Sequence, residues 1–300
     1  MRNTLVTLLG PTGIGKTDLA IDLAIYFGSE IISADSRQFY REMRIGTAVP
    51  SDDQLSKVRH HFIRFISITD YYSASLFERD VINLLPALFK NNPVVIMCGG
   101  SGLYIDAVLK GIDDIPDTDP AVREKYTGLF RKEGVESLRM ALKMLDPDHY
   151  RKVDLRNPKR LIRALEICET TGKPYSSFLG RKKPVRDFRI LKIGLEMPRE
   201  DLYRRINERV DRMIIDGLED EVRRLAGFRH MNALQSVGYR EFFDYFDGKI
   251  SRPDAIELIK RNSRRFARRQ ITWWAKDNDI KWFHPSAGDE IIRYIENEIL

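Results

Sequence analysis

The stretch Gly10-Pro-Thr-Gly-Ile-Gly-Lys-Thr17 matches the pattern GxxxxGK[ST], in which a glycine-rich loop cradles phosphate groups. It follows the apolar run Thr4–Leu9, and a helical pattern of spaced apolar residues comes after it. Glycines let backbone N–H groups converge on anionic oxygens, Lys16 adds a positive charge, and the Thr17 hydroxyl can ligate Mg²⁺. The stretch predicts a buried strand, a phosphate-binding loop and a helix, but it does not say whose phosphate is held.

The pattern around this loop predicts an α/β fold with a P-loop-type parallel sheet flanked by helices. Short apolar runs at 4–9, 30–34, 93–98 and 189–195 alternate with helical segments, which is typical of parallel strands. Turn-rich segments at 113–120 and 182–186 enclose a stretch with helical patterns and no strand pattern. We therefore expect a core formed by residues 1–115 and 187–300, interrupted by an all-helical insertion at 116–186.

Two helices are expected in the second part of the core. The first begins near Pro198 and continues to Leu225 with apolar residues at helical spacing, so that it should pack on the sheet. The second runs over 254–276 and places Ile256, Ile259, Phe266, Ile271 and Trp274 on one side. Its other side holds Arg261, Arg264, Arg265, Arg268 and Arg269.

Composition and charge restrict the class of protein. The chain has 300 residues, of which 43% are hydrophobic, and no run approaches the roughly 18 apolar residues of a membrane span. No leader pattern precedes the first strand, so we expect a cytoplasmic protein. Residues 1–150 hold 17 Lys and Arg against 20 Asp and Glu, whereas residues 151–300 hold 33 against 24. The basic second half favours an extended anionic partner, with nucleic acid as the leading candidate.

Asp35 is the candidate catalytic acid or base. It follows the second predicted strand, and strand ends in such sheets face the ligand crevice. Its carboxylate could accept a proton from a nucleophile, or it could cap the following segment. The strand at 93–98 instead ends in Gly99, Gly100 and Ser101, which suit close backbone approach and hydrogen bonding better than metal-bound hydrolysis.

A second basic cluster occupies the insertion, where Arg156, Lys159, Arg160 and Arg163 crowd the start of a predicted helix. Such a cluster by itself is more often a solvated helix face, but the arginine-rich helix at 254–276 reinforces the nucleic-acid interpretation. The two cysteines and five histidines show no metal-ligand spacing, and we assign them no chemistry.

Seven motifs in order resemble those of the bacterial tRNA dimethylallyltransferase family. They are GPTGIGKT, ISADSRQFYREMRIGTAVP, GGSGLY, DPAVR, NPKRLIRALE, ALQSVGYRE and ARRQITWW, and the likeness runs from residue 4 to about residue 283. No single motif is diagnostic, because many kinases share the P-loop, but the ordered set is specific. The resemblance implies transfer of a dimethylallyl group from dimethylallyl diphosphate to the exocyclic amine of the adenosine next to the tRNA anticodon.

The resemblance also implies roles for individual residues. Asp35 would be the general base, Lys16 and Mg²⁺ would stabilise the departing diphosphate, and Thr17 would ligate the metal. Ser101 stands where the family usually has threonine, so its hydroxyl remains with less restraint on its orientation. The implied diphosphate contacts are Gly10, Pro11, Thr12, Gly13, Ile14, Gly15, Lys16, Thr17 and, with less support, Arg223. The implied tRNA contacts are Asp35, Ser36, Arg37, Gln38, Ser101, Arg123, Lys159, Arg160, Leu161, Ile162 and Arg163, although Arg123 could instead reach the diphosphate. Arg269 and Gln270 are expected tRNA contacts on other grounds, because the end of the helix at 254–276 mixes charged, amide and aromatic groups as RNA contacts often do.

Two other functions remain open from the residues alone. A P-loop kinase with ATP in the loop would explain the first hundred residues equally well, but it leaves the basic second half unexplained. A non-catalytic RNA-binding protein with a nucleotide switch would tolerate loss of Asp35. For a tRNA-sized partner we expect the protein to act as a monomer.

Overall fold

The computed structural model describes residues 2–113, 115–116, 118–180 and 184–299. The chain divides into two compact units, one formed by Met1–Leu109 and Val185–Leu300 and the other by Lys110–Pro184. The insertion expected at 116–186 overlaps the second unit. Asp114, Asp117 and residues 181–183, which belong to the two expected boundary segments, lie outside the described residues.

Within the described residues, the first unit contains a sheet of six parallel strands in the order β3-β2-β4-β1-β5-β6. The strands are β1 (Thr4–Leu9), β2 (Ile31–Ser33), β3 (His60–His61), β4 (Val94–Gly99), β5 (Arg189–Leu195) and β6 (Lys281–Phe283). The predicted α/β class is confirmed, and β1, β2, β4 and β5 occupy the four predicted runs. The short edge strands β3 and β6 were not predicted.

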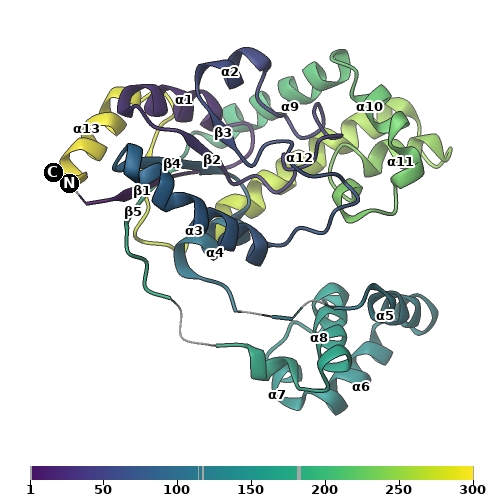
Figure 1. The fold of residues 1–300 in the computed structure, drawn as a ribbon. Coiled ribbons are helices and arrows are strands. Elements are labelled where there is room, and N and C mark those ends of the chain that lie inside the picture. The colour runs from purple at the N-terminus through teal and green to yellow at the C-terminus, as the bar shows by residue number, and fades with distance from the viewer. Residues whose placement is uncertain (1, 114, 117, 181–183, 300) are drawn as a thin grey trace. The chain divides into compact units, whose positions relative to one another are not determined.

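Helices of the first unit cover both faces of this sheet. They are α1 (Lys16–Phe27), α2 (Asp52–Lys57), α3 (Ala74–Asn91), α4 (Gly102–Lys110), α9 (Arg199–Ile215), α10 (Leu218–Arg224), α11 (Arg240–Phe246), α12 (Arg252–Trp274) and α13 (Gly288–Ile299), with short 3₁₀ turns at Ala226–Phe228 and Asn232–Leu234. Figure 1 shows α1 and α13 on one side of the strands and α3 and α4 on the other.

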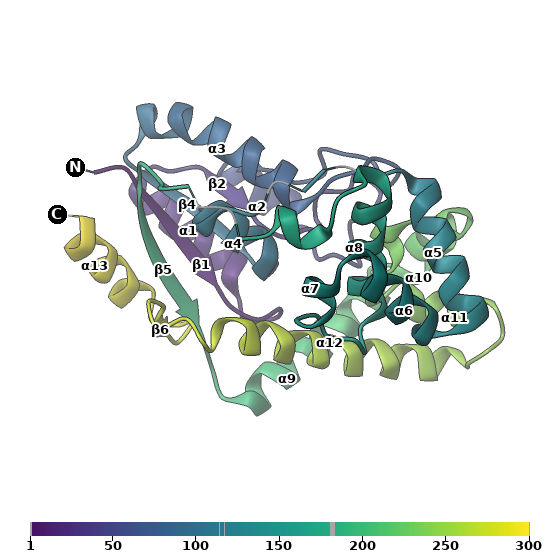
Figure 2. The same ribbon diagram turned by 90° about the horizontal axis from the view of Figure 1, so that it is seen from below.

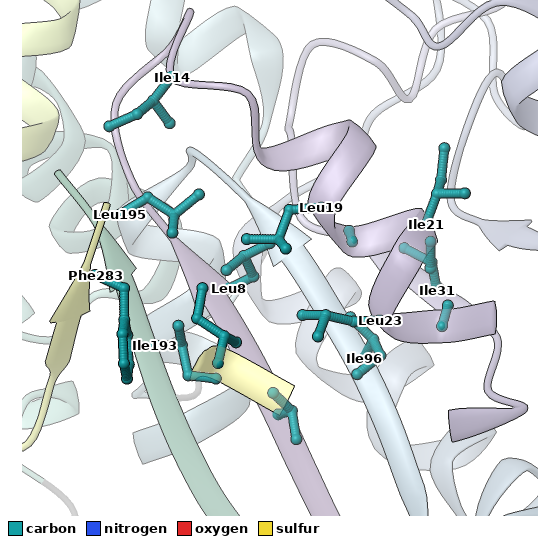
Figure 3. Close-up of a cluster of buried hydrophobic side chains, with 14 of the residues drawn as sticks. Leu8, Ile14, Leu19, Ile21, Leu23, Ile31, Ile96, Ile193, Leu195 and Phe283 are labelled. Atoms are coloured by element: carbon teal, nitrogen blue, oxygen red, sulfur yellow. The ribbon is translucent and has the colours of Figure 1, made fainter. Parts of the chain in front are cut away.

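Successive side chains of each strand point to opposite faces of the sheet, so the core consists of two layers. Leu8 and Ile193 pack with Leu19 and Leu23 of α1 in one cluster (Figure 3), whereas Leu5 and its neighbours pack with the apolar face of α3 and α4 in another. Burial on both faces explains why these strands appear in the sequence as continuous apolar runs.

The helix predicted from Pro198 to Leu225 is interrupted. α9 ends at Ile215, and Gly217 adopts a left-handed φ of 95° before α10 begins at Leu218. A glycine takes this conformation without steric cost, so the chain can turn although the apolar spacing continues. The first half of α9 packs on the sheet as expected, and its second half packs with α10 and α12.

The buried face of α12 differs from the prediction. Phe266 and Ile271 are 38% and 41% exposed, and the buried positions are Ala255, Ile259, Ser263, Ala267, Gln270 and Trp274. α12 runs beside α9 (Figure 2), and small residues at the contact allow the two helices to approach closely. Counting only large apolar residues therefore predicted Ile259 and Trp274 correctly but missed the small and polar residues of the buried face.

The second unit is helical throughout its described residues. It contains α5 (Pro120–Glu133), α6 (Val135–Leu145), α7 (Pro147–Tyr150), α8 (Pro158–Thr171) and a 3₁₀ turn at Tyr175–Phe178. Leu138 and Leu142 of α6 pack with Leu161 and Leu165 of α8 around Tyr126 of α5. In the described part of the chain, we find no helix with the length and apolarity needed to cross a membrane.

Candidate functional site

The phosphate-binding loop connects β1 to α1, and its backbone depends on glycine. Gly13 and Gly15 have φ values of 83° and 101°, in the left-handed region that side chains rarely adopt. A Cβ on Gly13 would also lie 2.8 Å from the Cγ1 atom of Ile206 in α9. The loop is therefore held in its curled form at the N-terminus of α1, where free N–H groups attract anions.

Lys16 supplies a positive charge inside this loop. Its Nζ atom donates hydrogen bonds of 2.9 Å to the carbonyl oxygens of Gly10 and Pro11. Burial lowers the pKa of the Lys16 ammonium to about 8, although Cys98 and Asp35 act in the opposite direction. An incoming anion would further stabilise the charged form, so Lys16 is suited to binding phosphate oxygens.

Two side chains from later in the chain hold Thr12 in place. The backbone N–H of Thr12 donates to Oε1 of Gln270 at 2.8 Å, and Arg209 donates to its hydroxyl at 2.7 Å. The amide of Gln270 also donates to the carbonyl oxygen of Gly100 at 2.8 Å. Gln270, predicted to contact tRNA, is 6% exposed, connects the loop to the end of β4 and lines both cavities described below.

Three arginines of α9 were missed by the sequence analysis. Arg205, Arg209 and Arg212 are spaced by four and three residues, and all three line the cleft beside the loop. Burial lowers the pKa of Arg209, and the nearby Asp35 partly offsets this shift. Their spacing was the available signal, because it places the three guanidinium groups on one helix face.

Asp35 lies where β2 ends. Its Oδ1 atom accepts the N–H of Arg37 at 3.0 Å, which is the local hydrogen bond that the capping alternative predicted. The segment that follows is a turn and not a helix. The same residue lines the cleft beside the loop, so capping and catalysis are compatible.

Ser101 lies beside Asp35 because β2 and β4 are neighbours in the sheet. Its hydroxyl accepts the N–H of Ser36 at 2.9 Å and donates to the Ser36 hydroxyl at 3.0 Å. The end of β4 can lie this close to the end of β2 only because residue 99 is glycine, since a Cβ there would lie 2.3 Å from the carbonyl oxygen of Ala34. The structure thus brings together Asp35, Ser36 and Ser101 from segments 65 residues apart.

Two cavities meet at this point. One, of about 770 Å³, contains Lys16 and Thr17, and the other, of about 480 Å³, contains Ser36, Arg37 and Ser101. The residues that line both are Thr12, Asp35, Thr47, Gly100, Arg209, Met213 and Gln270. A group bound at the loop can therefore face a group bound in the second cavity across Asp35.

Basic and aromatic side chains surround the second cavity. Arg240, Arg269, Phe266 and Trp273 line it, and Arg269 lies over the ring of Phe266 at 5.7 Å. Burial, followed by the charges of Arg240 and other arginines, lowers the pKa of Arg269. This combination suits an anionic, aromatic ligand such as a nucleotide.

Two other predicted residues of this region have structural partners. Arg37 donates from Nη1 to the carbonyl oxygens of Asn232 and Ala233, at 3.1 and 3.3 Å. Gln38 donates to the carbonyl oxygens of Thr47 and Ala48, at 3.2 and 2.9 Å, and both residues still line one of the cavities.

Arg223 is not brought to the loop. Its guanidinium pairs with Glu219 at 3.0 Å and lies 4.3 Å from the ring centre of Phe246, and it is absent from the described lining of both cavities. The arginines that line the cavity beside the loop are instead Arg205, Arg209 and Arg212 of α9.

The predicted contacts in the second unit divide into two groups. Lys159 and Arg160 are exposed at the start of α8. Leu161, however, is fully buried in the helical core, and Ile162 packs against that core, so Leu161 offers no side-chain surface to an RNA. The sequence segment was treated as one unit, whereas helix geometry turns successive side chains to different faces.

Arg123 and Arg163 share a buried acidic partner. Arg123 forms bonds of 2.6 and 3.2 Å to the two carboxylate oxygens of Glu166, and Arg163 contacts the same carboxylate at 3.4 Å. Arg163 also donates to the Thr118 hydroxyl at 3.0 Å. Because Glu166 is fully buried, both arginines stabilise this unit, whatever else they bind.

The metal prediction rests on Thr17. In the described part of the chain, no group of three or more His, Cys, Asp or Glu residues is arranged to hold a metal ion. Thr17 lines the larger cavity next to Lys16. The residues fit a Mg²⁺ ion that takes most of its ligands from phosphate oxygens and water, and they do not fit a metal held by the protein alone.

Comparisons with known proteins agree with this geometry. A family model described as IPP transferase matches residues 38–277. A tRNA dimethylallyltransferase 1 of Bacteroides thetaiotaomicron is 52% identical over 97% of this chain and 95% of its own length, and a tRNA dimethylallyltransferase of Christiangramia forsetii is 52% identical over 100% and 99%. The crystal structure of a tRNA isopentenylpyrophosphate transferase from Bacillus halodurans superposes with a TM-score of 0.71 at 35% identity, covering 99% of this chain and 96% of that one.

Proposed function

This chain belongs to the IPP transferase family, and we propose that it transfers a dimethylallyl group from dimethylallyl diphosphate to the exocyclic amine of the adenosine next to a tRNA anticodon. The observation that carries the proposal is the meeting of two cavities at Asp35. One cavity has the groups that bind a diphosphate, and the other has those that bind a nucleotide.

The donor diphosphate would lie on the loop. The backbone N–H groups at the start of α1, Lys16 and Arg209 surround the space that it would fill, and Arg205 lies close to Gly15. Thr17 would help to hold Mg²⁺, which would add positive charge against the departing diphosphate. Interactions of this kind stabilise the leaving group most when its charge is greatest, in the transition state.

The reaction is a substitution at carbon. The bond between the allylic carbon and the diphosphate oxygen breaks, and its electron pair leaves with the diphosphate. The amine nitrogen forms the new bond to that carbon and loses a proton, which the Asp35 carboxylate accepts. Asp35 suits this role because it lines both cavities, so that it can approach the amine on the side that faces the donor.

The acceptor adenine would enter the second cavity from the anticodon loop. Reaching it requires extraction of the base from its stack, which costs a few kcal/mol. Contacts with tRNA phosphates can offset this cost, and they would come from Arg269, Arg240 and the exposed basic residues of α8. Ser101 and Ser36 line this cavity, and in the proposal their hydroxyl groups would hydrogen-bond the edge of the base.

One assay separates this proposal from the two alternatives. The protein is incubated with Mg²⁺, unmodified tRNA, and either labelled dimethylallyl diphosphate or labelled ATP, and label is followed into the tRNA. Prenyl label should appear in the tRNA. A folded preparation that incorporates none, or that transfers phosphate from ATP to a small acceptor, contradicts the proposal.

Asp35→Asn tests the assignment of the base. It should lower the single-turnover rate by about 10²-fold or more with little change in tRNA affinity, because a positioned general base typically contributes 10²–10⁴-fold. If the variant instead binds tRNA tenfold more weakly and reacts at the normal rate, Asp35 is a binding residue. A non-catalytic RNA-binding switch would tolerate the change.

A further inference from the structure

A buried carboxylate that is absent from the described lining of both cavities holds a segment that lines them. The Glu221 side chain in α10 is 4% exposed and accepts three consecutive backbone N–H groups: those of Arg44 and Ile45 at 2.9 and 2.8 Å through Oε2, and that of Gly46 at 2.9 Å through Oε1. Successive N–H groups arranged in this way usually bind an external anion. Here an internal carboxylate occupies the position.

Tyr239 completes this arrangement. Its hydroxyl donates to Oε1 of Glu221 at 2.6 Å, and its ring is fully buried. Burial and the Glu221 charge raise the pKa of Tyr239, so the hydroxyl remains a donor at working pH. A Cβ on Gly46 would lie 2.6 Å from the Tyr239 ring, which shows how closely the segment is pressed against its anchor.

The anchored segment continues directly into the site. Residues 44–48, which we call the wall segment, line the larger cavity except at Gly46, and Gly46 and Thr47 line the smaller one. Ala48 has a φ of 51°, a left-handed conformation that is costly for a residue with a side chain. Such a conformation persists only where surrounding contacts impose it.

The wall segment is also tied to the catalytic turn. Gln38, three residues after Asp35, donates its amide to the carbonyl oxygens of Thr47 and Ala48. The side-chain oxygen Oε1 of Gln38 accepts a hydrogen bond of 3.3 Å from the hydroxyl of Ser33 in β2. The segment is therefore fixed from two sides, by Glu221 through its N–H groups and by Gln38 through its carbonyl groups.

We propose that Glu221 is a positioning residue for prenyl transfer: it fixes the wall segment so that the allylic carbon and the adenine amine meet in line at Asp35. Glu221 itself is absent from the described lining of both cavities, so it acts through the backbone it holds. This inference rests on the proposed function. The phosphate-binding loop does not depend on Glu221, because Gln270 and Arg209 hold it separately through their hydrogen bonds to Thr12.

Glu221→Gln tests the inference, because an amide keeps the size of the side chain but offers one acceptor oxygen to four donors. The single-turnover rate at saturating substrates should fall about tenfold, since one weakened hydrogen bond and a small misplacement each cost about this much or more. The KM for dimethylallyl diphosphate should stay within about threefold. The matched control is Asp220→Asn, an exposed carboxylate on the same helix, which should leave both values unchanged.

Hydrogen exchange gives a readout that does not need activity. The amides of residues 44–46 should exchange faster in Glu221→Gln than in the wild type and Asp220→Asn. Should Glu221→Gln fail to fold, Tyr239→Phe keeps the three backbone bonds, and a rate about threefold lower with unchanged KM is expected. A folded Glu221→Gln protein with the wild-type rate, or one that loses only donor affinity, overturns the inference. If the wild type itself transfers no prenyl group, the proposed function fails instead, and exchange at 44–46 still reports on the anchor.

Discussion

The low pKa of Lys16 predicts an alkaline limit on donor capture. In the free protein, burial lowers this pKa to about 8, against 10.5 for an ordinary lysine. Raising the pH from 7 to 9 therefore removes the ammonium proton from most molecules before the donor arrives. The diphosphate binds the charged form, so its affinity should fall as pH rises through 8.

The size of the effect follows from the titration. With a pKa of about 8, Lys16 is roughly nine-tenths charged at pH 7 and roughly one-tenth charged at pH 9. The kcat/KM for dimethylallyl diphosphate should thus fall about tenfold over this range. The bound diphosphate adds negative charge beside the ammonium and raises its pKa, so kcat at saturating donor should change much less.

The other groups facing Lys16 do not titrate in this range. Burial raises the pKa of Cys98 to about 11, and Arg209 keeps its charge. The assay is therefore prenyl transfer to tRNA at saturating tRNA and constant ionic strength, from pH 7 to 9.5, with donor concentration varied at each pH. In the Lys16→Arg variant, the kcat/KM that remains should not fall as the pH rises from 7 to 9.5. A kcat/KM that stays flat to pH 9.5 refutes the reasoning, as does an equal fall in kcat.

Three further outcomes are expected from substitutions. Gln270→Ala removes one buried and one partly buried hydrogen bond and leaves a cavity. It should therefore lower the free energy of unfolding by about 2–4 kcal/mol, measured by denaturant titration, and raise the KM for the donor. A loss of stability with unchanged KM would mean that the loop does not need these hydrogen bonds. Ala48→Gly removes the steric strain of the left-handed conformation at this position and should raise the free energy of unfolding by up to about 1 kcal/mol, measured by denaturant titration. A lower free energy of unfolding would show that the conformation is not strained. Replacing Lys159 and Arg160 together by alanine should weaken tRNA binding and reduce by about 1.5 the slope of the log binding constant against log salt concentration. Arg163→Ala should mainly destabilise the second unit. An unchanged slope in the double variant would place the tRNA contact surface elsewhere.

The sequence predicted the elements whose signal is local. The loop carries a motif, and the strands β1, β2, β4 and β5 each carry an apolar run, and the structure has them where they were expected. The edge strands β3 and β6 are only partly buried, so no continuous apolar run marks them, whereas β2, also three residues long, is fully buried. The break at Gly217 was hidden because apolar spacing continued across it.

Contacts between distant segments were harder to predict. Gln270 lies 258 residues from Thr12, and Arg209 lies 197 residues from it, so only the fold shows that both hold the loop. Gln270 was predicted as an RNA contact because the end of its helix mixes charged, amide and aromatic groups, but its side chain is buried and bonds to Thr12 and Gly100. Glu221 carries no motif of its own, and its importance depends on backbone N–H groups that no pattern marks.

The end of β4 explains why this P-loop suits group transfer better than hydrolysis. A nucleotide-hydrolysing site of this class places a carboxylate at the end of a neighbouring strand, where it holds Mg²⁺ and orients water. Here that strand ends in Gly99, and a Cβ would lie 2.3 Å from a carbonyl oxygen of the adjacent strand end, so no side chain fits. The carboxylate that lines both cavities is instead Asp35, on the next strand and beside the acceptor space. A base placed there could accept a proton from a nucleophile bound in the second cavity, and in the proposed reaction that nucleophile would displace the water that could otherwise consume the donor.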